Sequence, residues 1–141
     1  MTSRSHNERL GQVYRSSWWS IELQPGWTAS EGADCVSFSA APSKGVLQAS
    51  AIRKPSGSVT LEDLYEFASD PASQGTGFRT VAIGDISGIA SERVKNTRYW
   101  KEWWLKKGST MVYLTYNAPD ASKEREVSAI DKIVSSIAIH S

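Results

Sequence analysis

Two neighbouring segments rich in aromatic residues constrain the fold of this chain more than any other feature. Residues 98–106 and 109–116 flank Lys107 and Gly108, and a short Gly-containing connection between two such segments is typical of a β-hairpin. Side chains alternate between the faces of a strand, so a turn at Lys107-Gly108 fixes which residues share a face. One face is predicted to carry Tyr99, Trp103, Leu105, Val112, Leu114 and Tyr116. The opposite face is predicted to carry Trp100, Trp104, Met111 and Tyr113.

Other segments show the same alternation. In residues 18–23 the side chains of Trp19, Ile21 and Leu23 point to one side, and Pro25-Gly26 ends the pattern. Residues 35–39 and 46–53 also alternate. Three consecutive strands with short connections predict an antiparallel meander. Residues 78–83 and 86–93, joined at Gly84-Asp85, predict a further strand pair.

Two segments have the period of a helix. In residues 61–68 the side chains of Leu61, Leu64, Tyr65 and Ala68 share a face; Thr60 is a suitable N-cap, and Asp63 can reach back to it. Residues 122–138 place Val127, Ile130, Ile133, Val134 and Ile137 opposite charged residues, which predicts an amphipathic helix laid on the sheet. The sequence therefore predicts an α+β fold, a twisted antiparallel sheet with one face covered by an internal helix and a C-terminal amphipathic helix.

Length and composition narrow the class of protein. A chain of 141 residues predicts a single domain, which we expect to span residues 14–141 after a flexible lead-in of residues 1–13. Cys35 is the only cysteine, so an intrachain disulfide is excluded and a reducing, cytoplasmic location is expected. The polar N-terminus has no signal-peptide core, and no apolar run is long enough to span a membrane. A net charge of +1 argues against a nucleic-acid partner.

Several of these segments together resemble the PsbP-like (Mog/PsbP) family, in particular its small uncharacterised bacterial members. The resemblance lies in residues 17–27 with their Pro-x-Trp turn, the helix at 59–67, the segment 82–88, the aromatic hairpin 103–116 and the closing helix 126–137. Its glycines, Gly84 and Gly88, are read as permitting close backbone approach. The resemblance implies a non-enzymatic interaction protein, in bacteria an immunity or secretion-associated one, and transfers no particular partner.

Residues able to do chemistry are few. His6 and His140 lie in segments expected to be mobile, and Cys35 lies in a predicted strand where a buried, inert thiol is the simpler reading. The acidic residues of the 61–68 helix fit a solvated helix face. Gly75-Thr-Gly77 lacks the remainder of a dinucleotide-binding fingerprint, and the sequence contains no P-loop. We therefore predict no catalytic residues, no metal site and no cofactor.

The hairpin region is the one candidate site. Residues 93–107 contain six basic residues and one acidic residue, interleaved with four aromatic ones, and basic groups among aromatics can bind an acidic protein surface. The predicted partner-binding residues are Arg98, Trp100, Lys101, Trp104, Lys106 and Tyr113. Here Trp100, Trp104 and Tyr113 would form an exposed apolar anchor with the cations around it. Two alternatives remain open: the pattern also suits a purely structural half-buried hairpin, and the tryptophans could instead hold a small ligand or lipid between the sheet and the C-terminal helix. An enzyme is the least favoured class.

Overall fold

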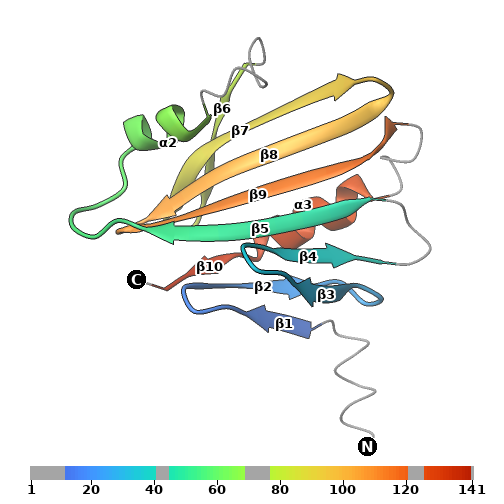
Figure 1. Cartoon of the computed structure of the whole chain (residues 1–141), viewed down its shortest axis with the longest axis horizontal. Coiled ribbons are helices and arrows are strands. Elements are labelled where there is room, and N and C mark those ends of the chain that lie inside the picture. Colours follow the sequence, from blue (N-terminus) through green and yellow to red (C-terminus); the bar gives the residue numbers. More distant parts are fainter. Residues whose placement is uncertain (1–11, 41–44, 69–76, 121–125, 141) are drawn as a thin grey trace, which may run out of the picture.

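The computed structural model describes residues 12–40, 45–68, 77–120 and 126–140. Within these ranges the strands form two antiparallel sheets, and two helices lie on opposite faces of the larger one (Figure 1). The seven-stranded sheet has the order β3 (Thr28–Glu31), β4 (Val36–Ser39), β5 (Val46–Arg53), β9 (Thr110–Pro119), β8 (Arg98–Lys107), β7 (Ile86–Lys95) and β6 (Arg79–Ile83). The three-stranded sheet has the order β1 (Gln12–Arg15), β2 (Trp19–Leu23) and β10 (Ala138–Ile139).

The inner face of the large sheet carries the main core. Helix α3 (Val127–Ser135) and the small sheet cover this face, and their apolar side chains join those of the large sheet in one cluster. The fully buried members include Ile21 from the small sheet, Ile133 from α3 and Leu114 from β9. Tyr14 of β1 also donates a hydrogen bond of 2.6 Å to Glu31 of β3. Partial burial and the Glu31 carboxylate raise the pKa of the Tyr14 hydroxyl to about 12, so the neutral donor persists at physiological pH.

Helix α2 (Leu61–Ala68) packs on the opposite, outer face. Its buried residues Leu64 and Ala68 form a second cluster with Ile89 of β7, Trp104 of β8 and Met111 of β9. The predicted α+β fold, with both helices on a twisted antiparallel sheet, is therefore confirmed. The prediction that they cover one face was wrong, because α2 and α3 pack on opposite faces, and the second helix is shorter than predicted. Residues 122–125 of the predicted helix lie outside the described residues, and Ala138 belongs to strand β10.

The central hairpin keeps the predicted faces although its turn lies one residue later. Lys107 pairs with Thr110, so Gly108 and Ser109 form the turn. Moving the turn by one residue changes each cross-strand partner by two positions, and a shift of two leaves every side chain on its own face. Figure 1 shows β8 and β9 as the long central strands of the sheet.

Two predictions about the N-terminal half were wrong. Strand β2 does not form a meander with β4 and β5: it pairs with β1 and β10 in the separate small sheet. The turn at Gly26, whose φ is +89°, leads instead into β3, which takes the place beside β4. Residues 12 and 13 of the predicted flexible lead-in belong to β1, and residues 1–11 lie outside the described residues.

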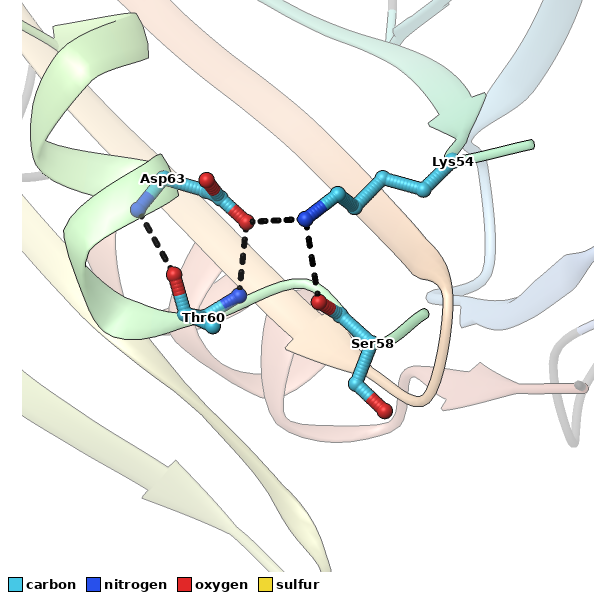
Figure 2. Close-up of polar contacts among 4 residues, drawn as sticks. All are labelled: Lys54, Ser58, Thr60 and Asp63. Atoms are coloured by element: carbon cyan, nitrogen blue, oxygen red, sulfur yellow. Dashed lines mark hydrogen bonds and ion pairs between the residues drawn. The ribbon is translucent and has the colours of Figure 1, made fainter. Parts of the chain in front are cut away.

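Two reciprocal hydrogen bonds fix the start of α2, as predicted. The Asp63 backbone amide donates to Thr60 Oγ1 at 3.1 Å, and the Thr60 amide donates to Asp63 Oδ2 at 2.9 Å. Figure 2 shows that Lys54 completes this network: its Nζ lies 3.0 Å from Asp63 Oδ2 and 3.2 Å from the Ser58 carbonyl oxygen. The network therefore ties α2 to the segment that follows β5.

Protonation of Asp63 is expected to loosen this network. The Thr60 amide and then the Lys54 ammonium lower the pKa of the Asp63 carboxyl below its usual value. A carboxyl whose pKa is lower in the folded state stabilises the fold above its unfolded pKa, about 4, and loses that contribution as the pH falls through the lowered value. The difference in Tm between wild type and Asp63→Asn should thus be larger at pH 7 than at pH 2. The control is Glu66→Gln, which removes a charge from the same helix outside the network; a wild-type-like pH dependence of Asp63→Asn would contradict the prediction.

Candidate partner-binding surface

Five of the six predicted binding residues share the outer face of the sheet, and the sixth does not. Lys101 is an odd-numbered residue of β8 and points to the inner face, where it is 7% exposed. Its Nζ lies 3.2 Å from Asp131 Oδ1 of α3 and 5.3 Å from the centre of the Trp103 ring. The prediction that Lys101 belongs to the binding surface was therefore wrong, since its charge pairs with α3 on the far side of the sheet.

Trp104 is a core residue rather than an exposed anchor. Its side chain is 4% exposed because α2 covers it. Phe78 makes an edge contact with the Trp104 ring at a centroid distance of 5.7 Å, and Tyr113 lies 5.4 Å away on the other side. The sequence pattern placed Trp104 on the correct face, but the prediction of its exposure was wrong. Lys106, two residues further along β8, is half-buried beside Met111.

Trp100 and its neighbours form a charged, partly exposed surface on the half of the outer face beyond Trp104. The Trp100 side chain is half-buried, and the Arg93 guanidinium carbon lies 5.7 Å from its ring centre. Arg93 Nη1 also donates to Glu102 Oε1 at 2.8 Å, and the Tyr113 hydroxyl donates to Glu102 Oε2 at 2.6 Å. Both oxygens of this carboxylate are thus engaged, and its charge is compensated by Arg93. We call Arg93, Arg98, Trp100, Glu102 and Tyr113 the hairpin surface.

Arg98 is held by an amide and not by a carboxylate. Its Nε and Nη2 donate to Asn117 Oδ1 at 3.0 and 2.7 Å, and Asn117 is 8% exposed. A neutral acceptor orients the guanidinium without cancelling its charge. No carboxylate of the described residues lies within ion-pair distance of Arg98 or of Lys106, so the hairpin surface has a net positive charge. Arg93 was counted among the basic residues of this region but not among the predicted binding residues, and its pairing with Trp100 across β7 and β8 shows that it belongs to the same face.

The interface between α3 and the sheet is packed. Ile130, Ile133 and Val134 of the helix are at most 3% exposed and contact the sheet core, which disfavours the alternative of a ligand held between them. An open groove of about 910 Å³ does lie beside α3, and its lining includes Glu92, Tyr99 and Asp131. Burial and then Glu92 raise the pKa of the Tyr99 hydroxyl, which donates to Glu92 Oε2 at 2.5 Å. Asp131 accepts from Lys101, as described above.

His140 and Cys35, which were considered for catalysis, lie within the fold. His140, expected to be mobile, is held: its backbone amide donates to the Trp18 carbonyl oxygen at 2.7 Å, and its Nε2 lies 3.3 Å from Ser20 Oγ. Cys35 is half-buried immediately before β4, where it is not paired in a disulfide. In the part of the chain that the structure describes, no three His, Cys, Asp or Glu residues gather closely enough to hold a metal ion. Nor does any described helix have the length and apolar character needed to cross a membrane.

The order of these strands and the two helices on opposite faces define a PsbP-like fold, as the resemblance implied. The solution structure of cyanobacterial PsbP (CyanoP) from Synechocystis is similar, with a TM-score of 0.67 and 16% sequence identity over 92% of this chain and 92% of that one. A crystal structure from Bacteroides thetaiotaomicron is similar with a TM-score of 0.64 and 15% identity over 93% of this chain, which spans only 49% of that longer protein. No protein-family model and no curated protein matches the sequence. Sequence identities of 15% and 16% show that the fold is shared and do not show a shared function.

Proposed function

We propose that this protein is a non-enzymatic interaction module that binds an acidic surface of another protein through the hairpin surface. The observation that carries the proposal is the arrangement of Arg98 and Trp100: an oriented, uncompensated guanidinium lies two residues from a half-exposed indole. Tryptophan and arginine are the residues most often responsible for binding energy at protein interfaces. Because both side chains are already held in place, little conformational entropy is lost when a partner binds.

The chemistry of the surface indicates the kind of partner. Glu102 is neutralised by Arg93, whereas Arg98 keeps its charge, so carboxylates on the partner would find a cation and no uncompensated anion. The net charge of the whole chain is only +1, which favours a local acidic protein surface over a nucleic acid. More specifically, the proposed role is that of an immunity or secretion-associated protein. The proposed location is a reducing cytoplasm, which suits the free thiol of Cys35.

Quantitative affinity capture from an extract of the native cell, followed by measurement of Kd with the purified partner, tests the proposal. Arg98→Glu and Trp100→Ser should each weaken binding at least about 10-fold, the loss expected for interface residues that dominate the energy. The matched control is Arg79→Glu, which reverses a charge on edge strand β6, where Arg79 is exposed and lies 4.0 Å from Glu92. Recovery of the same partners with the same Kd by all variants would exclude the hairpin surface. A toxin or a secretion component as the partner would support the finer role.

A further inference from the structure

An apolar groove lies on the outer face beside α2, and neither the hairpin surface nor the core accounts for it. It has a volume of about 280 Å³. We call its apolar lining residues the α2 groove: Ile52, Pro55, Val59, Phe67 and Met111. Phe67 is 54% exposed and Ile52 is 44% exposed, which is unusual for two large apolar side chains that face the same space. The groove has the size and chemistry to accept one large apolar side chain.

The walls of the α2 groove are held in place before any partner binds. One wall is α2, whose first turn is fixed by the Lys54 and Asp63 network of Figure 2. The segment between β5 and α2 is hydrogen-bonded to the β8–β9 turn. The Lys54 amide donates to the Ser109 carbonyl oxygen, and the Val59 amide donates to the Gly108 carbonyl oxygen, both at 2.8 Å. A preformed site of this kind avoids the cost of ordering its own walls on binding.

The α2 groove and the hairpin surface lie at the two ends of one uncovered strip of sheet. The register pairs Ile52 with Met111 at the groove end and Asn117 with Trp100 at the other end. The outer-face positions of β5 and β9 between these two pairs are half-buried, and Tyr113 of the hairpin surface is one of them: Gln48, Ser50, Tyr113 and Thr115. Among the described residues, the helices leave this strip bare, since α2 packs towards β7 and β8 and α3 lies on the inner face. Met111 and Asn117 are six positions apart on β9, which corresponds to roughly 20 Å.

We infer that one amphipathic helix of the partner lies along this strip, with a large apolar side chain in the α2 groove and acidic residues against Arg98 and Trp100. The inference rests on the proposed function and names the form of the partner. A bare sheet face next to a packed helix is where a second helix completes the layer. A span of about 20 Å corresponds to about 13 helical residues, so the apolar residue and the acidic residues should be about that far apart.

Charge on the strip sets the direction of the bound helix. Arg98 carries an uncompensated charge at the hairpin end. At the groove end Asp63 is paired with Lys54, and Arg53 turns its guanidinium to the inner face, where it donates to Thr110 Oγ1 and lies 5.1 Å from the Trp18 ring centre. Carboxylates of the partner are therefore favoured at the hairpin end, and the groove end selects an apolar residue. Reversing the helix would place its acidic residues beside apolar walls whose two cations, Lys54 and Arg53, are turned to Asp63 and to the inner face, and would leave Arg98 without a carboxylate partner.

The test is a selection of displayed helical peptides of about 20 residues, randomised on one face, against the full chain. Selected peptides should share a large apolar residue and acidic residues about 13 positions away. Their affinity, measured by fluorescence anisotropy, should fall at least about 10-fold with Phe67→Gln, with Ile52→Thr and with Arg98→Glu. The control is Leu61→Gln, at a similarly exposed site on the other flank of the same helix, 41% exposed. Circular dichroism and Tm establish that each variant is folded, which the exposure of these side chains favours.

The possible outcomes separate this inference from the proposed function. Loss of binding with Arg98→Glu and Trp100→Ser, but not with Phe67→Gln or Ile52→Thr, would overturn the role of the α2 groove and leave the hairpin surface in place. Loss with the groove variants alone would overturn the hairpin surface and the single strip with it. An equal loss with Leu61→Gln, or a selection that enriches no peptide, would also overturn the inference.

Discussion

Replacing Gly88 by alanine is expected to lower the free energy of unfolding by more than about 3 kcal/mol. Gly88 of β7 pairs with Leu105 of β8 inside the large sheet. An added Cβ would overlap the Trp104 carbonyl oxygen and lie 2.9 Å from the Leu105 Cα. These are backbone atoms of a central strand, so the overlap can be relieved only by separating β7 from β8. Equilibrium urea unfolding, monitored by tryptophan fluorescence, measures the loss.

Gly77→Ala is the matched control for this substitution. A Cβ at Gly77 would have nothing within 4 Å, and the residue is exposed. We expect a change of less than about 0.5 kcal/mol. A similar effect of the two substitutions would mean that the close approach of β7 to β8 at Gly88 does not determine stability.

The second large effect is expected from Trp104→Ala, which should cost about 3–5 kcal/mol of unfolding free energy. The substitution empties the space between α2 and the sheet, where Trp104 contacts Leu64, Phe78 and Tyr113. Because α2 packs on the Trp104 side chain, the substitution should also weaken the packing of α2 against the sheet. Urea unfolding measures the stability, and hydrogen exchange of the α2 amides reports the attachment.

Trp100→Ala provides the comparison within the same strand. The Trp100 side chain is half-buried and lies beyond the cover of α2, so its removal should cost only about 1 kcal/mol. The pair of variants thus separates folding from binding, because Trp100 contributes to the proposed interface and Trp104 to the core. Equal losses of stability would contradict the different burial of the two tryptophans.

The sheet was predictable where the side-chain period of two was strong. In β8 and β9 only one assignment of side chains to the two faces puts the large apolar residues together. That assignment is correct although the turn was predicted one residue too early. Likewise, Thr60 and Asp63 marked the start of α2 by local hydrogen bonding alone. These features depend on residues close in sequence, so the sequence carries them directly.

The small sheet was not predictable for the opposite reason. Strand β1 of this sheet is mostly exposed and shows no apolar alternation, and β10 has two residues that become a strand only by pairing with β2. Strand β3, which takes the place beside β4 in the large sheet, is exposed along its whole length. Nothing local distinguishes β2 as a member of a second sheet, because Ile21 and Leu23 alternate as they would in a meander. Its assignment depends on pairing with β10, a strand far away in the sequence, as well as with β1.

The candidate site was predictable in its face but not in its exposure. Parity alone separates Lys101 from Arg98, Trp100, Trp104 and Lys106, and this signal was present in the sequence. The burial of Trp104 was not, because it depends on α2 crossing the outer face at that point. The α2 groove was equally hidden, since Ile52 and Phe67 meet only when β5 and α2 are brought together.

The pairing of β2 with β10 also bears on the order in which the molecule folds. Ser20 and His140, whose side chains lie 3.3 Å apart, are 120 residues apart in the sequence, and contacts of such separation form late because the intervening chain must first be ordered. During synthesis β2 can pair with β1 at once, but its other edge must wait for nearly the whole described chain before β10 exists. Until β10 is made, one edge of β2 stays open to aggregation and to chaperones, so the small sheet is completed last.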